Sequence, residues 1–223
     1  MVSAKTPSPA ARKPGRPARD SSDAAADIRK AALTAFARAG FNGVSISEIA
    51  QAAGVAKPLV HYHYASKDAL WLAAVGEALG TLQTEIQVAL RTSGPPVTLQ
   101  VLLKRLARQL VLFASRYPDV VRVVVDETGK GSARAQWLYQ AFLLPSYGLS
   151  QSLMTKLTQE IHPGGKALRA EHLVPTVLGV MNFPFLEAGL IAQAYGKDVY
   201  SKPYLARQSE ILYRVFLALL EPV

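Results

Sequence analysis

Residues 57–67 carry the side chains whose chemistry is most informative in this chain. They read Lys-Pro-Leu-Val-His-Tyr-His-Tyr-Ala-Ser-Lys. Lysine reaches a guanine edge or a phosphate, hydroxyl and ring nitrogens bind phosphate oxygens, and Pro58 and Leu59 suit thymine methyl groups. Outward Leu and Tyr side chains are wasteful on an ordinary surface helix but useful on a helix in the major groove of DNA. We expect DNA contacts from Ser45, Ser47, Lys57, Pro58, Leu59, His61, Tyr62, His63 and Lys67.

Two short helices are needed to position these side chains, and the sequence has the signals for both. Ser45 and Glu48 have the spacing of a capping box, which begins a helix. Gly54 ends it, because glycine adopts the left-handed conformation found at helix C-termini. A second helix follows over about residues 56–62, with Pro58 in its first turn and Val60 facing inward. The pattern predicts a helix-turn-helix, which delivers its second helix into the major groove.

Ser66 and Lys67 lie directly after this unit. Ser66 is placed to cap the next helix, and the positive end of that helix, together with Lys67, predicts a phosphate clamp. The simpler alternative is a pair of packed short helices in an all-α protein. A capping box alone is common, but the combination of cap, turn, aromatic-histidine run and Ser-Lys at this spacing favours DNA binding.

Residues 28–71 resemble the N-terminal domain of the TetR family of bacterial transcriptional regulators. His63 matches the Tyr-x-His-Phe pattern of that family, Tyr64 replaces its Phe, and His61 stands where the family has a phosphate-contacting Tyr. The other matching positions are Ile28, Ala32, Ala35, Phe36, Gly40-Phe41, Val44-Ser45-Ile46, Glu48-Ile49-Ala50, Ala53-Gly54-Val55, Ser66-Lys67 and Leu70. The resemblance implies an all-α homodimer with a three-helix DNA-binding domain and a larger ligand-binding and dimerisation domain. It also implies that a small ligand moves the two DNA-reading heads apart and releases a DNA operator.

Composition and charge agree with a DNA-binding protein. The 223 residues carry a net charge of +9 and no cysteine, which excludes disulfides and thiolate metal sites. Residues 1–67 hold ten Lys and Arg against four Asp and Glu, whereas residues 68–223 hold fifteen against twelve. Basic clustering of this kind favours a polyanionic partner, although a solvated basic tail has the same composition. With no long apolar run and no secretory signal, we expect a soluble cytoplasmic protein without a membrane span.

Residues 1–21 form a basic segment rich in Pro, Ala and Ser, which we expect to be a disordered arm. Its Gly15-Arg16-Pro17 core resembles an AT-hook. Arg16 would then lie in the minor groove, and loose attraction to phosphates is the equally weighted alternative.

Hydrophobic periodicity predicts an all-α fold for the remainder. Residues 22–67 form the DNA-binding domain, whose first helix covers about residues 23–39. Residues 68–223 form the second domain, with one helix continuing from residue 67 to about 91 and five more. Those five helices are expected over residues 98–115, 118–127, 134–160 with a possible bend at Pro145, 170–194 with a kink at Pro184, and 203–220.

The last helix is apolar almost all round between Ile211 and Leu220, and therefore needs cover on two sides. A second copy of the chain related by a two-fold axis supplies that cover, and the alternative is a central helix within one domain. The residues predicted for the dimer interface are Val177, Ile211, Leu212, Val215, Phe216 and Leu219.

Aromatic and methionine side chains are concentrated between residues 137 and 185. They are either ordinary core or the lining of a pocket for a small, largely apolar ligand. The predicted lining residues are Trp137, Phe142, Met181, Phe183 and Phe185.

Enzymatic activity is the competing hypothesis with the least support. The chain has no Glu-x-x-His pair for a di-iron site and no His-Glu-x-x-His zinc motif, and His61 and His63 point in different directions on a helix. We therefore expect no catalytic residue, no metal and no cofactor. A protein that coats DNA without sequence preference is the other alternative, and it would need neither a pocket nor outward Leu59 and Tyr62.

Overall fold

The computed structural model describes residues 21–90 and 98–220, and these residues form helices and connecting turns without strands. The predicted all-α class is confirmed. The basic arm predicted for residues 1–21, including Arg16, lies outside the described residues, except that Ser21 begins the first helix.

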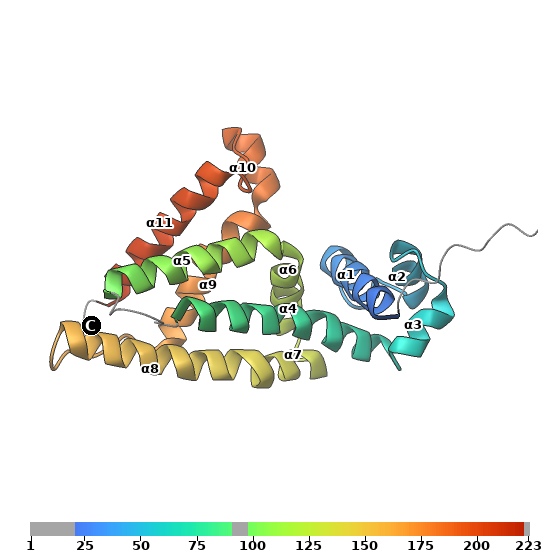
Figure 1. Cartoon of the computed structure of the whole chain (residues 1–223), viewed down its shortest axis with the longest axis horizontal. Coiled ribbons are helices and arrows are strands. Elements are labelled where there is room, and N and C mark those ends of the chain that lie inside the picture. Colours follow the sequence, from blue (N-terminus) through green and yellow to red (C-terminus); the bar gives the residue numbers. More distant parts are fainter. Residues whose placement is uncertain (1–20, 91–97, 221–223) are drawn as a thin grey trace, which may run out of the picture.

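Three helices form the N-terminal head at one end of the molecule (Figure 1). They are α1 (Ser21–Ala39), α2 (Ile46–Ala52) and α3 (Lys57–His63). Their inner faces meet in a cluster of fully or almost fully buried side chains that includes Ile28, Phe36, Ile49 and Val60. Because these apolar residues recur at helical spacing, each short helix is stabilised by packing rather than by its own length.

The body follows as a longer set of helices. α4 (Lys67–Leu90) extends from the head into the body, with α5 (Leu99–Arg116) on one side and α8 (Leu144–Ile161) on the other (Figure 1). Between α5 and α8 the chain forms α6 (Pro118–Thr128), α7 (Ala133–Leu138) and a π-helical segment, η1 (Tyr139–Leu143). The C-terminal elements are α9 (Ala170–Leu186), α10 (Ala188–Tyr195) and α11 (Lys202–Leu219).

The six helices expected after the head are present, but two of them are divided. The helix predicted over residues 134–160 is a continuous helical run whose turns widen at η1, just before Pro145. Pro145 has no amide hydrogen for the carbonyl four residues earlier, so the preceding turn is free to open. The amide of Leu144 accordingly donates to the carbonyl of Tyr139, five residues back.

The helix predicted over residues 170–194 is divided at Glu187, three residues after Pro184, and α9 and α10 meet at 64°. The missing amide of Pro184 leaves the Val180 carbonyl without its helical donor. Gln208 of α11 replaces it, since its Nε2 donates to that carbonyl at 2.7 Å. This side-chain bond allows α9 to continue past the proline.

Two hydrophobic cores exist, and the boundary between them crosses α4. Leu70, Trp71 and Val75 of α4 pack into the head core, together with Val123 of α6 and Leu138 of α7. The far end of α4 packs instead against the body core of α5, α8, α9 and α11. α4 is therefore a rigid element common to both parts of the chain.

Across the described ranges no single helix is long and apolar enough to span a membrane, and α9 with α10 passes such a test only as a bent pair.

Candidate DNA-reading surface and ligand cavity

The capping box at α2 fixes the start of the helix-turn-helix. The Glu48 carboxylate accepts from the Ser45 amide at 2.7 Å, and the Ser45 hydroxyl accepts from the Glu48 amide at 3.2 Å. The hydrogen bond from the Ser45 backbone, and then the one with its side chain, lowers the pKa of Glu48. At the other end of α2, Gly54 has φ of 66°, the left-handed conformation that its role in the turn requires. Both local predictions are confirmed.

α3 has one buried side and one exposed side. Val60 is fully buried beneath it, while Lys57, Pro58 and His61 are exposed and Tyr62 is 78% exposed. Leu59 is half-buried. Pro58 lies in the first turn of α3, where its lack of an amide hydrogen costs nothing. α3 thus presents a cationic, hydroxyl-bearing and apolar surface on a rigid base.

His63 is placed differently from its neighbours. Its ring is half-buried and meets the Tyr62 ring edge-on at 5.1 Å, and its Nε2 is buried without a hydrogen-bond partner. His63 therefore packs at the edge of the exposed surface, whereas Ser45 and Ser47, at the start of α2, are exposed.

Lys67 begins α4 beside this surface. The Ser66 hydroxyl accepts from the Ala69 amide at 3.0 Å and so caps the helix. The Lys67 ammonium lies 4.4 Å from the centre of the Phe41 ring, which restrains the side chain without neutralising its charge. A restrained cation at the positive end of a long helix is a suitable site for a phosphate group.

Tyr64 belongs to a network that sequence reasoning missed. Its hydroxyl donates to the Ala25 carbonyl at 3.2 Å and accepts from Arg29 at 3.0 Å, while Arg29 pairs with Glu77 of α4. The Glu77 interaction is the main cause that raises the pKa of Arg29 above its usual value. The network fixes the end of α3 against α1 and α4, and the signal for it was a hydroxyl where the resembling family has Phe.

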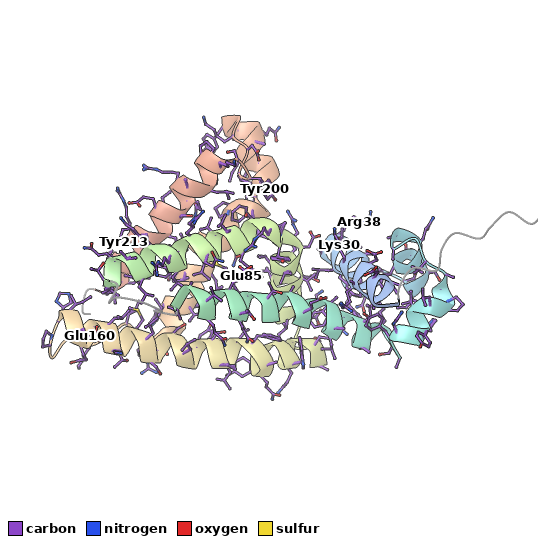
Figure 2. All side chains as sticks on the ribbon, in the orientation of Figure 1. Lys30, Arg38, Glu85, Glu160, Tyr200 and Tyr213 are labelled. Atoms are coloured by element: carbon purple, nitrogen blue, oxygen red, sulfur yellow. The ribbon has the colours of Figure 1, made fainter. Side chains whose placement is uncertain are left out.

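The exposed charged side chains of the described head include three cations as well as the carboxylates of Asp23 and Glu48. Lys57 is exposed on α3, and Figure 2 shows Lys30 and Arg38 projecting from α1. Arg29, by contrast, is held in its pair with Glu77. The head therefore has exposed cations on α1 and α3, in addition to Arg29, which is held in an ion pair.

A cavity of about 420 Å³ lies in the body. Its lining is almost entirely aliphatic and comes from α4, α5, α8, α9 and α11. The polar members are Gln83 and Gln87 of α4 and Ser146 and Ser150 of α8, and among the described residues no charged side chain lines the cavity. All but Ser150 of these polar residues are exposed, so they form a neutral, hydrogen-bonding rim to an apolar interior.

Of the five residues predicted to line a pocket, Met181 alone lines this cavity. Trp137 and Phe142 belong to the head core, where Trp137 meets Trp71 and Phe142 edge-on. Phe185 is buried elsewhere in the body core, and Phe183 is 61% exposed on α9. The sequence shows that a side chain is apolar but not which of two cores it enters.

The residues predicted for the dimer interface differ in their exposure. Ile211 is exposed, and Val215 and Leu219 are half-buried on the same side of α11. Leu212 and Phe216 are buried within their own chain, so these two are corrected from interface to interior, whereas Val177 is half-buried and lines the cavity together with Phe216. The apolar composition of α11 thus arises partly from covering its own cavity.

Comparison with known proteins agrees with this geometry. Residues 28–74 match the family model of bacterial regulatory proteins, tetR family. The transcriptional regulator BetI of Rhizobium meliloti is 35% identical over 66 residues, covering 30% of this chain and 32% of BetI. The transcriptional activator FasR of Mycolicibacterium smegmatis is 36% identical over 63 residues, covering 28% of this chain and 29% of FasR. The chain thus matches about a third of the length of these curated relatives.

The fold extends the likeness beyond the head. The transcriptional regulator FadR from Bacillus subtilis, solved in complex with stearoyl-CoA, superposes with a TM-score of 0.64 at 15% identity. The superposition covers 89% of this chain and 98% of FadR. Residues 28–74 thus carry the sequence pattern of the TetR family, and the chain shares its fold with a solved transcriptional regulator.

Proposed function

We propose that the chain is a dimeric transcriptional regulator that reads a palindromic DNA operator with α3 and is released from it by a small apolar ligand. The observation that carries the proposal is the surface of α3, where Lys57, Pro58 and Tyr62 are exposed above the fully buried Val60. A rigid helix with such a surface suits the major groove, and Lys67 and the start of α2 suit the flanking phosphates.

The cavity supports a ligand with a long apolar chain and an uncharged polar end. Aliphatic walls favour the chain, and the glutamine and serine rim offers hydrogen bonds to a hydroxyl, ester or amide. A carboxylate or phosphate at the same place would lack a cationic partner among the described lining residues, which favours an uncharged end group. FadR, whose solved complex holds stearoyl-CoA, supports a ligand with an acyl chain.

The outer surface of α9 and α11 supports the dimer. Ile211 and Leu217 of α11 and Phe183 of α9 are large apolar side chains exposed to solvent in the single chain. A two-fold axis that pairs these helices with their copies would cover them and set the spacing of the two heads. Replacing Ile211 or Phe183 with Lys should therefore yield monomers in light scattering, whereas Lys156→Ala should leave the dimer unchanged.

DNA binding is tested by selecting fragments of the source genome with the purified protein and measuring their affinities by fluorescence anisotropy. The proposal predicts enrichment of an inverted repeat whose half-sites lie ~34 Å apart or a modest multiple of that. Lys57→Ala and Leu59→Ala should alter which bases are preferred. Equal affinity for all fragments would instead identify a protein that coats DNA without sequence preference.

Ligand release is tested with three probes of equal chain length: dodecanol, laurate and lauroyl-CoA. The proposal predicts that dodecanol binds most tightly and weakens operator binding. Tighter binding of laurate or lauroyl-CoA would contradict the neutral rim but keep the apolar cavity. A reporter gene placed behind the operator in the cytoplasm of a bacterial host then gives the sign of regulation, which we propose to be repression.

A further inference from the structure

Arg134, at the start of α7, connects the head and the body through three contacts. Its guanidinium lies 2.6 Å from the Asp68 carboxylate and 3.2 Å from the Glu127 carboxylate. The same group stacks 3.5 Å from the centre of the Phe41 ring. The side chain is only 16% exposed. A planar guanidinium can satisfy two carboxylates and one aromatic face at once, which a lysine cannot.

The partners of Arg134 come from three different elements. Asp68 follows Lys67 in the first turn of α4. Phe41 lies in the segment between α1 and α2, and its ring also contacts the Lys67 ammonium. Glu127 lies near the end of α6 and is held by the Ser132 hydroxyl. Arg134 therefore lies next to the proposed phosphate-binding lysine although it is 67 residues away in the sequence.

The two ion pairs differ in how easily they separate. Glu127 is 1% exposed, so breaking its pair with Arg134 would leave a charge buried and is strongly disfavoured. Asp68 is 58% exposed and is well solvated when it is released. The contact of Arg134 with α6 is therefore fixed, and its contact with the start of α4, directly after the head, is free to open.

Arg134 is also continuous with one wall of the cavity. α7, η1 and α8 form one helical run, and α8 lines the cavity through residues such as Ser146 and Ser150. α4 lines the facing wall through Gln83 and Gln87. A molecule that enters between these walls would separate α8 from α4, and the same displacement would act on the Arg134–Asp68 pair.

We propose that Arg134 is a positioning residue that holds the head in one orientation on the body, and that cavity occupancy reaches the head by opening its pair with Asp68. The second part of this proposal, the coupling of cavity occupancy to the head, rests on the ligand response proposed above. The first part, the positioning of the head, is independent of DNA and ligand.

The positioning is tested with Asp68→Asn, because this change breaks the exposed pair and leaves no buried charge unpaired. Glu85→Gln is the matched control, since it breaks another ion pair of α4, with Arg116, that does not reach the head. The chain has no cysteine, so Lys30→Cys on α1 and Lys156→Cys on α8 accept spin labels specifically. Labelled chains are diluted with unlabelled chains so that each dimer carries one label pair.

The distance distribution between the labels should broaden or shift in Asp68→Asn and remain unchanged in Glu85→Gln. An unchanged distribution in Asp68→Asn, or the same change in both variants, would overturn the positioning role. This result is obtained without DNA, so it stands even if the proposed function fails.

The coupling is tested by the ratio of operator affinities without and with dodecanol. Asp68→Asn should reduce this ratio about two- to fivefold, the range expected for a partly exposed pair, while dodecanol affinity in the absence of DNA stays the same. Glu85→Gln should keep the wild-type ratio. A wild-type ratio in Asp68→Asn overturns the coupling, and a wild-type protein that ignores dodecanol refutes it together with the proposed ligand response.

Discussion

Lys67→Met removes one cation at the start of α4 and little else. The Lys67 ammonium stands 4.4 Å from the Phe41 ring, so its aliphatic stem leads over that ring. Methionine is similar in length, flexible and able to pack on an aromatic face, which preserves the local contact while removing the charge. The change therefore isolates the electrostatic role that we propose for this residue.

The expected magnitude follows from counterion release. Each phosphate contact contributes about −0.9 to the slope of the logarithm of affinity against the logarithm of salt concentration. A dimer that loses two such contacts should therefore have a slope that is shallower by ~1.8. Extrapolated from 1 M to 0.15 M salt, that difference in slope amounts to ~1.5 logarithmic units, or a ~30-fold weaker complex. The corresponding loss of binding free energy is ~2 kcal/mol.

Anisotropy titrations of operator and unrelated duplexes between 0.05 and 0.3 M NaCl measure both quantities. The loss should be the same for every sequence, because a phosphate contact carries no base information. Lys156→Met, an exposed lysine on α8, should leave the slope unchanged. A wild-type slope in Lys67→Met would refute the phosphate contact, and an altered sequence preference would mean that Lys67 reaches a base.

Three further outcomes follow from the contacts described. Tyr64→Phe should lower the free energy of unfolding by ~1 kcal/mol and speed amide exchange in α3, because the ring stays but the hydrogen bonds with Ala25 and Arg29 are lost. Unchanged amide exchange would contradict that network. Leu153→Trp should fill the cavity, so calorimetry should detect at least ~10-fold weaker dodecanol binding while operator affinity is retained. Dodecanol binding equal to that of the wild type would mean that the ligand binds elsewhere. Hydrogen bonds from Ser45 lower the pKa of Glu48, so the cap is complete above the ordinary Glu pKa of ~4.3 and is lost as the pH falls through the lowered pKa. Amide exchange in α2 should therefore rise only at such acidic pH. A rise at neutral pH would contradict the cap.

The head was predictable from sequence because its determinants are local. A capping box spans four residues, the Gly54 turn needs one left-handed residue, and Pro58 marks the first turn of the next helix. Each signal acts within one turn of helix. The exposed side of α3 then follows from helical periodicity once Val60 is assigned to the core.

The body was less predictable because its determinants are tertiary. Leu212 and Ile211 are adjacent and equally apolar, yet one is buried in its own chain and the other is exposed. The continuation of α9 past Pro184 involves Gln208, 24 residues later, which donates to the Val180 carbonyl. Arg134 gave no signal at all, since its partners are distant in sequence and of ordinary residue types.

The central claim is that two copies of α3 read a defined DNA sequence. The most direct measurement is sequencing of genomic fragments retained by the purified full-length protein at physiological salt, in parallel with Lys57→Ala. We expect one enriched inverted repeat for the wild type and a changed preference for the variant. Retention of all fragments in proportion to their input would contradict the central claim.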